Sequence, residues 1–400
     1  MRSILNTIFV KTLTKVRYNI QLPDNKSIVI RKMIKDFVLQ GVIDDISPEQ
    51  CNDIKIVWKS LILLKSSIQA IENERFITID VEDCGAAYRF IMALAAAVPS
   101  RIFLTGTKRL LQRPIQPLVD ALNGVGANIK QTLNGWLIYG KNLKINTLEV
   151  DASLSSQFAS ALILIAPLIK LKSLKLPHQK IASFSYFEMS LAVMSDFPVE
   201  VVGFKNDSHN IGELGDWSAA VFWFAHACLN PENQYSLYPL STDSIQPDSA
   251  IVEWFEKLGL KIECSNKIID IHYITKSNLP KITYDMSQNL DLVPVMAALA
   301  CKLPADFTFK NVENLRYKES DRLTQLVKQL SPFSEISFDD NSLRVVGNVN
   351  NDFSKAKFDS MDDHRLAMAF LLLTSQNNIL GLQCIKKSYK NLLNQLNNIL

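Results

Sequence analysis

The chain has 400 residues, of which 48% are hydrophobic and 21% charged, a composition typical of globular proteins rather than disordered or fibrous ones. This length exceeds one ordinary core and predicts two domains of similar size. The formal net charge of +3 is too small to indicate a nucleic-acid partner, so none is expected.

The six cysteines are scattered, with no CxxC pair and no histidine at a metal-ligand spacing. They indicate neither a disulfide framework nor a metal site, and they are typical of a reducing compartment. The N-terminal residues lack the apolar stretch of a signal peptide, and the longest apolar runs are shorter than a membrane span. We therefore expect a cytoplasmic protein with no membrane partner.

Along the chain, one pattern recurs about six times, at intervals of roughly 60 to 75 residues, which suits a βαβ-rich unit. Each copy has a polar opening, an apolar helix of about three turns and then a β-rich strand. The first and weakest copy begins at Lys26. The later copies begin at Asp83, Ser155, Asp216, Leu290 and Asp362.

The helices of this repeat are apolar nearly all round, so we expect them to be buried. A buried helix presents free backbone N–H groups and partial positive charge at its N-terminus. Taken singly, each polar opening is more simply read as a helix cap. Basic residues nevertheless accompany these openings, namely Lys26, Arg31, Arg89 and Arg365. Several such ends facing one cleft would bind phosphate or carboxylate groups.

Two segments before the middle of the chain add candidate ligand groups. Arg113 precedes Pro114, which predicts an arginine at a helix N-terminus with proline as the first helical residue. Ser155, Ser156 and Gln157 offer uncharged hydroxyl and amide donors suited to phosphate oxygens or sugar-like hydroxyls. A plain serine cap is an equally good interpretation of the second segment.

The densest charged cluster is NLRYKESDRL, which begins at Asn314. If the segment is helical from about Tyr317, then Lys318 and Arg322 share one face, with Glu319 beside them. Such an array is usually a solvated helix face. Here, however, it follows the strand-like DFTFK and opens a new helix, where ligand-binding groups tend to occur.

The segment MDDHRLAMAF places Arg365 at the start of a wholly apolar helix. A buried arginine needs an anion, which can be an internal carboxylate or a ligand. His364 is more simply a capping or supporting residue than a base. Asp291 is the lone acid at the opening of the fifth helix. Nucleotide-binding, serine-hydrolase and zinc-protease motifs are missing from the chain, so no cofactor or metal is expected.

The motifs KESDR, DHRLAM, SSQF and LTG followed by RP, in this arrangement, resemble the EPSP synthase family of enolpyruvyl transferases. The resemblance extends from about Lys26 to Lys387. It implies a two-domain, inside-out α/β barrel with three βαβαββ units around buried parallel helices in each domain. One domain would hold residues 22–214 and the other residues 1–21 plus 215–400, with the ligands bound in the cleft between them.

The resemblance also implies a role for each matching residue. The catalytic residues would be Lys26, Asp291 and Glu319, and Asp53 would be a further acid in the cleft. Phosphoenolpyruvate would be bound by Lys26, Gly85, Arg113, Gln157, Arg322, Arg365 and Lys387. Shikimate 3-phosphate would be bound by Lys26, Ser27, Arg31, Ser155, Ser156, Gln157, Ser183, Tyr186, Asp291, Asn314 and Lys318.

The implied reaction transfers the enolpyruvyl group of phosphoenolpyruvate to shikimate 3-phosphate by addition and elimination, on the route to chorismate and aromatic amino acids. It needs an acid, a base and a cation on the leaving phosphate, but no cofactor. The resemblance suggests a monomer whose partners are these two small molecules. The alternatives are transfer to a UDP-sugar, for which the family uses a cysteine absent from RLLQRP, and an inactive ligand-binding relative.

The chain departs from the family pattern mainly in its first half. Asp24 and Asn25 replace the glycine and serine of PGSKS, and Asp83 and Ala86 replace an asparagine and a threonine. Phe184 follows Ser183 where lysine is common. Asp83 is a good helix cap, but its charge should weaken anion binding nearby unless the side chain turns away.

Overall fold

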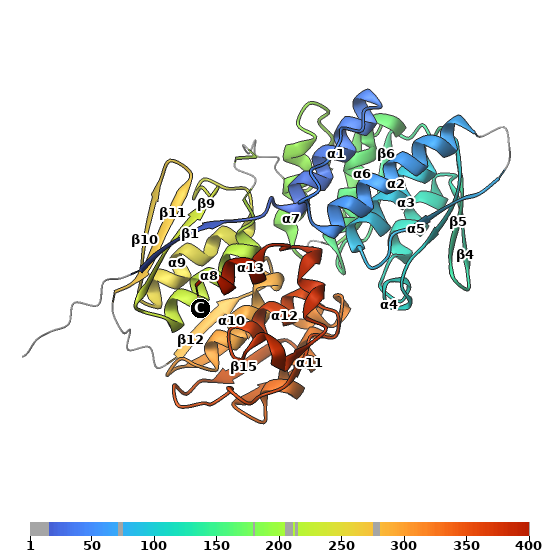
Figure 1. The fold of residues 1–400 in the computed structure, drawn as a ribbon. Coiled ribbons are helices and arrows are strands. Elements are labelled where there is room, and N and C mark those ends of the chain that lie inside the picture. The colour runs from blue at the N-terminus through green and yellow to red at the C-terminus, as the bar shows by residue number, and fades with distance from the viewer. Residues whose placement is uncertain are drawn as a thin grey trace, which may run out of the picture.

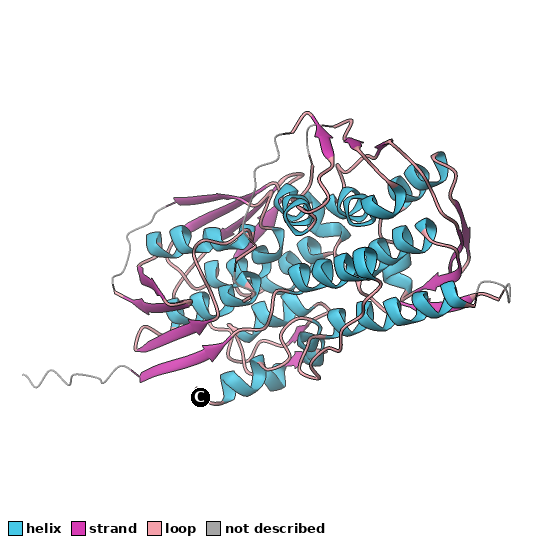
Figure 2. Cartoon of the chain, turned by 90° about the horizontal axis from the view of Figure 1, so that it is seen from above, coloured by secondary structure: helices cyan, strands magenta, loops and turns pink. Residues whose placement is uncertain are grey.

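The computed structural model describes residues 16–70, 75–178, 181–204, 211–212, 215–274 and 281–399. Within these ranges the chain forms two bodies side by side, one blue to green and the other yellow to red (Figure 1). Helices gather in the interior and strands lie toward the outside (Figure 2). Each body has its own hydrophobic core. The predicted domain boundary at residue 214 lies outside the described residues.

The core of the first body packs side chains from Ile30 to Val201. Its helices are α1 (Lys26–Gln40), α2 (Asn52–Gln69), α3 (Gly85–Ala97), α4 (Lys108–Leu111), α5 (Gln116–Gly124), α6 (Ser156–Ile169) and α7 (Phe184–Val193). Its strands are β2 (Ile77–Asp80), β3 (Ser100–Thr105), β4 (Asn128–Thr132), β5 (Gly135–Gly140), β6 (Thr147–Glu149), β7 (Ser173–Lys175) and β8 (Glu200–Val202). They form one sheet in the order β2-β3-β5-β4 and another in the order β6-β7-β8.

The core of the second body begins with Ile20 and Leu22 and then resumes at Trp217. Its helices are α8 (Trp217–Leu229), α9 (Ile251–Lys257), α10 (Val293–Ala300), α11 (Arg322–Leu330), α12 (His364–Leu371) and α13 (Leu392–Asn397). Its strands are β1 (Val16–Gln21), β9 (Asn233–Tyr238), β10 (Leu260–Ser265), β11 (Ile268–Tyr273), β12 (Lys281–Asp285), β13 (Asp306–Lys310), β14 (Glu335–Phe338), β15 (Ser342–Val346), β16 (Phe358–Asp359) and β17 (Ile379–Leu380). No described helix is long and apolar enough to span a bilayer.

Three sheets share one topology, because β2-β3-β5-β4, β1-β9-β11-β10 and β12-β13-β15-β14 are built alike. In each sheet the first two strands are parallel and the remaining neighbours are antiparallel. The complete βαβαββ pattern therefore occurs in three units, and the other described units carry fewer strands. The strand β1 belongs to a unit that continues at α8, so the whole first body is inserted between these two elements (Figure 1).

The six repeated helices begin where the sequence predicts them, as α1, α3, α6, α8, α10 and α12. Five of them are buried as expected: all residues of α10 and α12 are buried, for example, and α3 lacks only Ala86. The first, α1, buries only one face, with Ile28, Ile30, Arg31, Ile34 and Phe37, so the expected burial is wrong there. Side chains that cap these helices include Asn25, Asp216 and Asp363, each of which accepts a hydrogen bond from a backbone N–H of the first turn.

Three other local predictions are wrong. The first repeated helix is followed by α2 rather than by a strand, after Gly41 ends α1 in the left-handed conformation. The helix expected from Tyr317 begins only at Arg322, where the side chain of Asp321 caps it; the preceding turn is a 3₁₀ helix, η4 (Glu313–Tyr317). The helix α5 begins at Gln116, so Pro114 precedes it and Pro117 occupies its first turn.

Candidate active site

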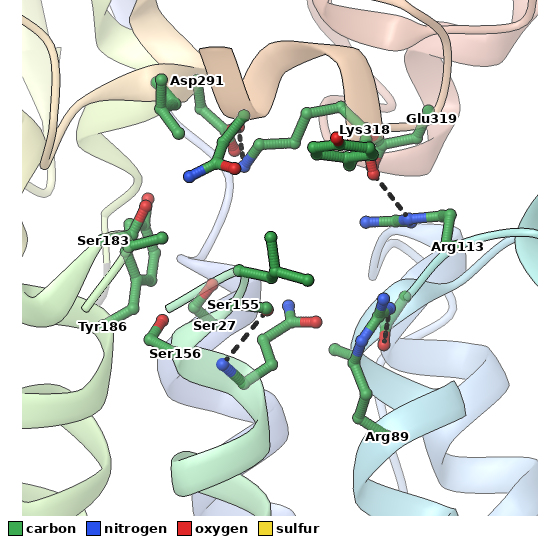
Figure 3. A pocket seen from close by; sticks show the side chains of 18 of the residues that line it. Ser27, Arg89, Arg113, Ser155, Ser156, Ser183, Tyr186, Asp291, Lys318 and Glu319 are labelled. Carbon is green, nitrogen blue, oxygen red and sulfur yellow. Dashed lines mark hydrogen bonds and ion pairs between the residues drawn. The ribbon is translucent and has the colours of Figure 1, made fainter. Parts of the chain in front are cut away.

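A polar pocket lies between the two bodies, and its lining comes from both (Figure 3). Side chains from the openings of α1, α3 and α6 line one side, and the loop after η4 together with the segment before α10 lines the other. The lining residues are Lys26, Ser27, Ile30, Arg31, Asp53, Gly85, Ala86, Arg89, Arg113, Pro114, Leu154, Ser155, Ser156, Gln157, Ala182, Ser183, Tyr186, Leu290, Asp291, Asn314, Tyr317, Lys318 and Glu319.

Lys26, the first residue of α1, extends from that helix toward Asp53 of α2. Its Nζ lies 2.7 Å from Asp53 Oδ2, and both side chains are largely shielded from solvent. Burial alone would lower the pKa of Lys26, but the carboxylates of Asp53 and Glu319 together outweigh burial, and the pKa is raised above its ordinary value. Lys26 is therefore a fixed positive charge in the pocket.

Asp291 faces Lys26 from the second body and is surrounded by cations. Its Oδ1 lies 2.9 Å from Arg322 Nη1 and 3.2 Å from Lys318 Nζ, and its Oδ2 lies 3.4 Å from Arg365 Nη2. Burial would raise the pKa of this carboxyl, but the three cations hold it well below its usual range. Asp291 is thus an ionised carboxylate, able to accept a proton once its cations are partly neutralised.

Glu319 lies beside Asp291 and shares its main partner. Arg322 Nη2 is 2.7 Å from Glu319 Oε2, while Arg322 Nε is 2.7 Å from Asp363 Oδ2. Burial would raise the pKa of Glu319, but Arg322 and Arg113 keep it well below its usual value. Asp363 is fully buried and also accepts hydrogen bonds from Ser320. Arg322 is therefore held rigidly by three carboxylates.

Arg365 and His364 open the buried helix α12. Arg365 Nη1 donates to the backbone oxygen of Ser218 at 2.9 Å, and Nη2 faces Asp291, so an internal carboxylate supplies the anion that a buried arginine needs. Both ring nitrogens of His364 are buried with no hydrogen-bond partner among the described residues. Burial, together with Lys26 and Arg365, lowers the pKa of His364 well below its usual value, so the ring is neutral.

Two arginines of the first body point into the same space (Figure 3). Arg89 donates to the backbone oxygens of Gly85 and Pro114 at 3.0 and 2.8 Å, and burial beside Arg113 lowers its pKa to about 9. Arg89 Nε, Arg113 Nη1 and Gln157 Oε1 are buried with no partner among the described residues. Two of these three orphans are guanidinium donors, which suit an anionic ligand.

Gly85 leaves room for one of these guanidinium groups. A Cβ atom on Gly85 would lie 2.6 Å from Arg113 Nη1, closer than van der Waals contact permits. The glycine at the start of α3 therefore allows Arg113 to reach over the helix N-terminus, where backbone N–H groups and the helix dipole favour negative charge.

The uncharged donors meet at the start of α6. Ser155 caps this helix by accepting a hydrogen bond from the backbone N–H of Gln157 at 3.3 Å. Ser156 and Gln157 follow in the first turn, and all three line the pocket. Ser155 therefore caps α6, and it also lines the pocket together with Ser156 and Gln157.

The remaining predicted contacts of shikimate 3-phosphate surround the start of α7. Arg31 donates to Ser190 Oγ at 2.7 Å and to the backbone oxygens of Ser27 and Tyr186 at 2.8 and 3.0 Å. Burial lowers the pKa of Arg31 to about 10. Ser183 precedes α7 in the left-handed conformation and, like Ser27 and Tyr186, lines the pocket.

Lys387 does not line this pocket. Its ammonium group pairs with Asp83 across the two bodies and donates to the backbone oxygen of Asp362 at 2.6 Å. Asp83 is not the cap of α3, which corrects the prediction, because Cys84 Sγ accepts the hydrogen bond from Ala87 N. The carboxylate of Asp83 is thus turned to a cation of the other body.

The pocket brings together most of the predicted site. Of the predicted residues, Arg322 and Arg365 lie behind Asp291 rather than in the lining, and Lys387 lies outside it. The sequence interpretation did not assign Asp363 to the site, although its place before His364 and Arg365 was a usable signal. Within the described residues no cluster of three metal-ligating side chains occurs.

The model of the family "EPSP synthase (3-phosphoshikimate 1-carboxyvinyltransferase)" matches residues 51–396. The chain belongs to the EPSP synthase family. It is 29% identical to the 3-phosphoshikimate 1-carboxyvinyltransferase of Bacteroides fragilis, with 89% of this chain and 88% of that protein covered. It is 27% identical to the enzyme of the same name from Haemophilus influenzae, with 99% of both covered.

The fold is that of solved members. The chain is similar to the EPSP synthase structure from Acinetobacter baumannii, with a TM-score of 0.63, 16% identity and 96% of both chains covered. It is also similar to the enolpyruvyl transferase NikO from Streptomyces tendae, with a TM-score of 0.59, 12% identity, and 96% of this chain and 95% of that one covered. The predicted family, fold class and activity, which is carboxyvinyl transfer from phosphoenolpyruvate to shikimate 3-phosphate, are confirmed by these matches.

Proposed function

We propose that the pocket between the two bodies holds phosphoenolpyruvate and shikimate 3-phosphate together and that its side chains carry out the transfer. The observation that supports this most is the convergence of Lys26, Arg113 and Lys318 on a pocket that also holds two half-buried carboxylates, Asp291 and Glu319. Both substrates carry a phosphate and a carboxylate, so a site for the pair needs several cations and also an acid and a base.

Shikimate 3-phosphate is assigned to the side of the pocket formed by α1, α6 and α7. The hydroxyl groups of Ser155, Ser156 and Ser183 and the amide of Gln157 can bind its phosphate and ring hydroxyls. The remaining proposed contacts are Lys26, Ser27, Arg31, Tyr186, Asp291, Asn314 and Lys318. Arg31 acts mainly through the elements that it joins, because each of its guanidinium nitrogens already donates to the protein.

Phosphoenolpyruvate is assigned to the side near α3 and α11. The N-terminus of α3 at Gly85 and the unpartnered donor of Arg113 suit its phosphate. Arg322 and Arg365 suit its carboxylate, provided that they share their present partner Asp291 with the ligand. Lys26, Gln157 and Lys387 are the further proposed contacts, and Lys387 must release Asp83 before it can bind the ligand.

The charges explain how two ionised carboxylates can act as base and acid. Asp291 removes the proton from the attacking hydroxyl as its oxygen bonds to the central carbon of phosphoenolpyruvate. Glu319 delivers a proton to the methylene carbon, which gives a tetrahedral intermediate. Substrate anions beside Arg322 and Arg113 offset the cations that depress the pKa of Glu319, so substrate binding raises that pKa and allows protonation.

The second half of the reaction reverses the proton transfer at the methyl group. Glu319 removes a proton from the methyl carbon, the double bond re-forms, and phosphate leaves. Lys26, a half-buried cation whose pKa is raised, stabilises the charge on the departing phosphate. Asp291 passes the proton that it took from the hydroxyl to the leaving phosphate, so residues of this chain account for each proton in the addition and in the elimination.

We further propose that the two bodies are the two domains that close over the substrates, with residues 22–214 in one and residues 1–21 plus 215–400 in the other. The side chain of Leu22 packs in the second core, which supports a crossing between the two bodies at about this residue. We propose a cytoplasmic monomer; all six cysteines, which lie in the described part of the chain, are free thiols.

The test is release of phosphate by the purified protein supplied with phosphoenolpyruvate, with and without shikimate 3-phosphate. Release that depends on shikimate 3-phosphate is expected. Release only with a UDP-sugar would assign the chain to the other branch of the enolpyruvyl transferases. No release with either acceptor, from protein that still binds shikimate 3-phosphate, would identify an inactive ligand-binding relative.

A further inference from the structure

Arg109 of the first body contacts the loop of the second body that carries Lys318 and Glu319. The guanidinium group of Arg109, on the short helix α4, donates to three backbone oxygens of this loop. Nη2 lies 2.9 Å from the oxygen of Arg316 and 3.3 Å from that of Lys318, and Nε lies 3.3 Å from that of Glu319. These bonds join two segments that are far apart in the sequence and belong to different cores.

A second arginine completes the contact. Arg113 Nε donates to the backbone oxygen of Tyr317 at 3.1 Å. Together, Arg109 and Arg113 bind four consecutive backbone oxygens, those of residues 316 to 319. Arg316 and Tyr317 are the last residues of η4, and Lys318 after them is extended, so the carbonyl oxygens at this helix end can accept bonds from another element.

The contact leaves the side chains of the loop available to the pocket. Lys318 Nζ faces Asp291, and Glu319 faces Arg322, while Arg109 binds only their backbone oxygens. Arg109 is exposed and does not line the pocket itself. A planar guanidinium with several donors suits this task, whereas a lysine ammonium cannot span the same set of acceptors.

We propose that Arg109 is a positioning residue that binds the loop carrying Lys318 and Glu319 when the two bodies close, and so places both side chains over the substrates. This proposal rests on the roles proposed above for Lys318 and Glu319. Arg109 acts through the loop and not on the substrates, so its removal changes how readily the closed site forms.

The first experiment compares Arg109→Ala with Lys108→Ala, which removes an equally exposed cation from the same helix. We expect Arg109→Ala to lower kcat/KM for both substrates by about tenfold or more, because small errors in the placement of catalytic groups are costly. Arg109→Lys should restore only part of this loss. The melting temperature should match that of Lys108→Ala, because an exposed side chain of α4 contributes little to either core.

The second readout is hydrogen exchange of the peptide covering residues 313–322, measured with both substrates bound. Faster exchange in Arg109→Ala than in Lys108→Ala is expected. The proposal is overturned if the two variants agree within twofold in kcat/KM, or if exchange of this peptide is unchanged. Failure of this proposal can be told apart from failure of the proposed function. Phosphate release by the unaltered protein tests the reaction, and Glu319→Gln tests the role of the Glu319 side chain.

Discussion

Asp83 and Lys387 form an ion pair that joins the two bodies beside the pocket. Burial would lower the pKa of Lys387, but the carboxylate of Asp83 outweighs burial and raises it, so the lysine stays charged. Asp83 is the residue that departs from the asparagine implied by the resemblance, and its carboxylate is directed at Lys387 of the other body. A lysine proposed to bind phosphoenolpyruvate is, without substrate, already neutralised by a carboxylate.

Asp83→Asn should therefore lower the KM for phosphoenolpyruvate, because the ligand no longer competes with a carboxylate for Lys387. We expect about a fivefold change, equivalent to about 1 kcal/mol, with kcat little altered. Steady-state kinetics at saturating shikimate 3-phosphate measures the KM for phosphoenolpyruvate and kcat. Glu49→Gln is the control, because it removes another ion pair between the bodies, with Lys390 at 3.0 Å, away from the pocket lining. An unchanged or higher KM in Asp83→Asn alone would count against the competition.

Asp291→Asn should abolish most turnover while leaving substrate binding largely intact. The amide cannot take the hydroxyl proton, and loss of a general base typically costs about 10² to 10⁴ in rate. Removing this negative charge leaves Lys318, Arg322 and Arg365 less neutralised, so affinity for phosphoenolpyruvate should be equal or higher. Calorimetric binding and single-turnover phosphate release measure the two effects. Retained turnover would remove Asp291 from the base role.

The repeated helices could be predicted because their signal is local. A capping side chain such as Asp216 and the apolar run after it specify a buried helix without reference to the rest of the chain. The local pattern did not bring Asp291 and Glu319 together; their expected place in one site came from the resemblance to the family. Arg322 then joins these two carboxylates in the structure.

The contacts between the bodies could not be predicted from the sequence. The pairing of Asp83 with Lys387, and of Arg109 with the oxygen of Arg316, depends on how two separate cores meet. Local propensity also failed where side chains competed for a cap. Cys84 rather than Asp83 caps α3, since the carboxylate has a cation within reach in the other body.

Gly85→Ala should weaken phosphoenolpyruvate binding without destabilising the fold. The added Cβ would meet Arg113 Nη1 at 2.6 Å, and this is the far end of a flexible side chain that can move away. Displacing the guanidinium should raise the KM for phosphoenolpyruvate by about tenfold, because a charge-assisted contact is lost. Gly124→Ala is the matched control, because a Cβ there meets nothing within 4 Å. If Gly85→Ala lowered the melting temperature as well as the affinity for phosphoenolpyruvate, the cause would be a general packing defect instead.

Asp248 should make the stability of the second body depend on pH. It is buried, accepts hydrogen bonds from Ser218 Oγ and from Asn289 Nδ2 at 3.0 Å, and lies near Asp291 and Arg365. Burial raises its pKa to about 6, above the value of about 3.9 in an unfolded chain. The stability contributed by its protonated form is therefore fully present below about pH 4 and is lost as the pH rises through about 6.

Asp248→Asn should reduce this dependence, because the amide stays neutral and keeps one acceptor oxygen. Two pKa units at about 1.4 kcal/mol each correspond to about 3 kcal/mol between pH 4 and pH 8. We expect the unfolding free energy of Asp248→Asn, relative to the unaltered protein, to be more favourable at pH 8 than at pH 5. Denaturant unfolding at both pH values measures the difference, with the exposed Asp243→Asn as control. A difference that does not change with pH would show that the Asp248 carboxyl has the same charge in the folded and unfolded chain throughout this range.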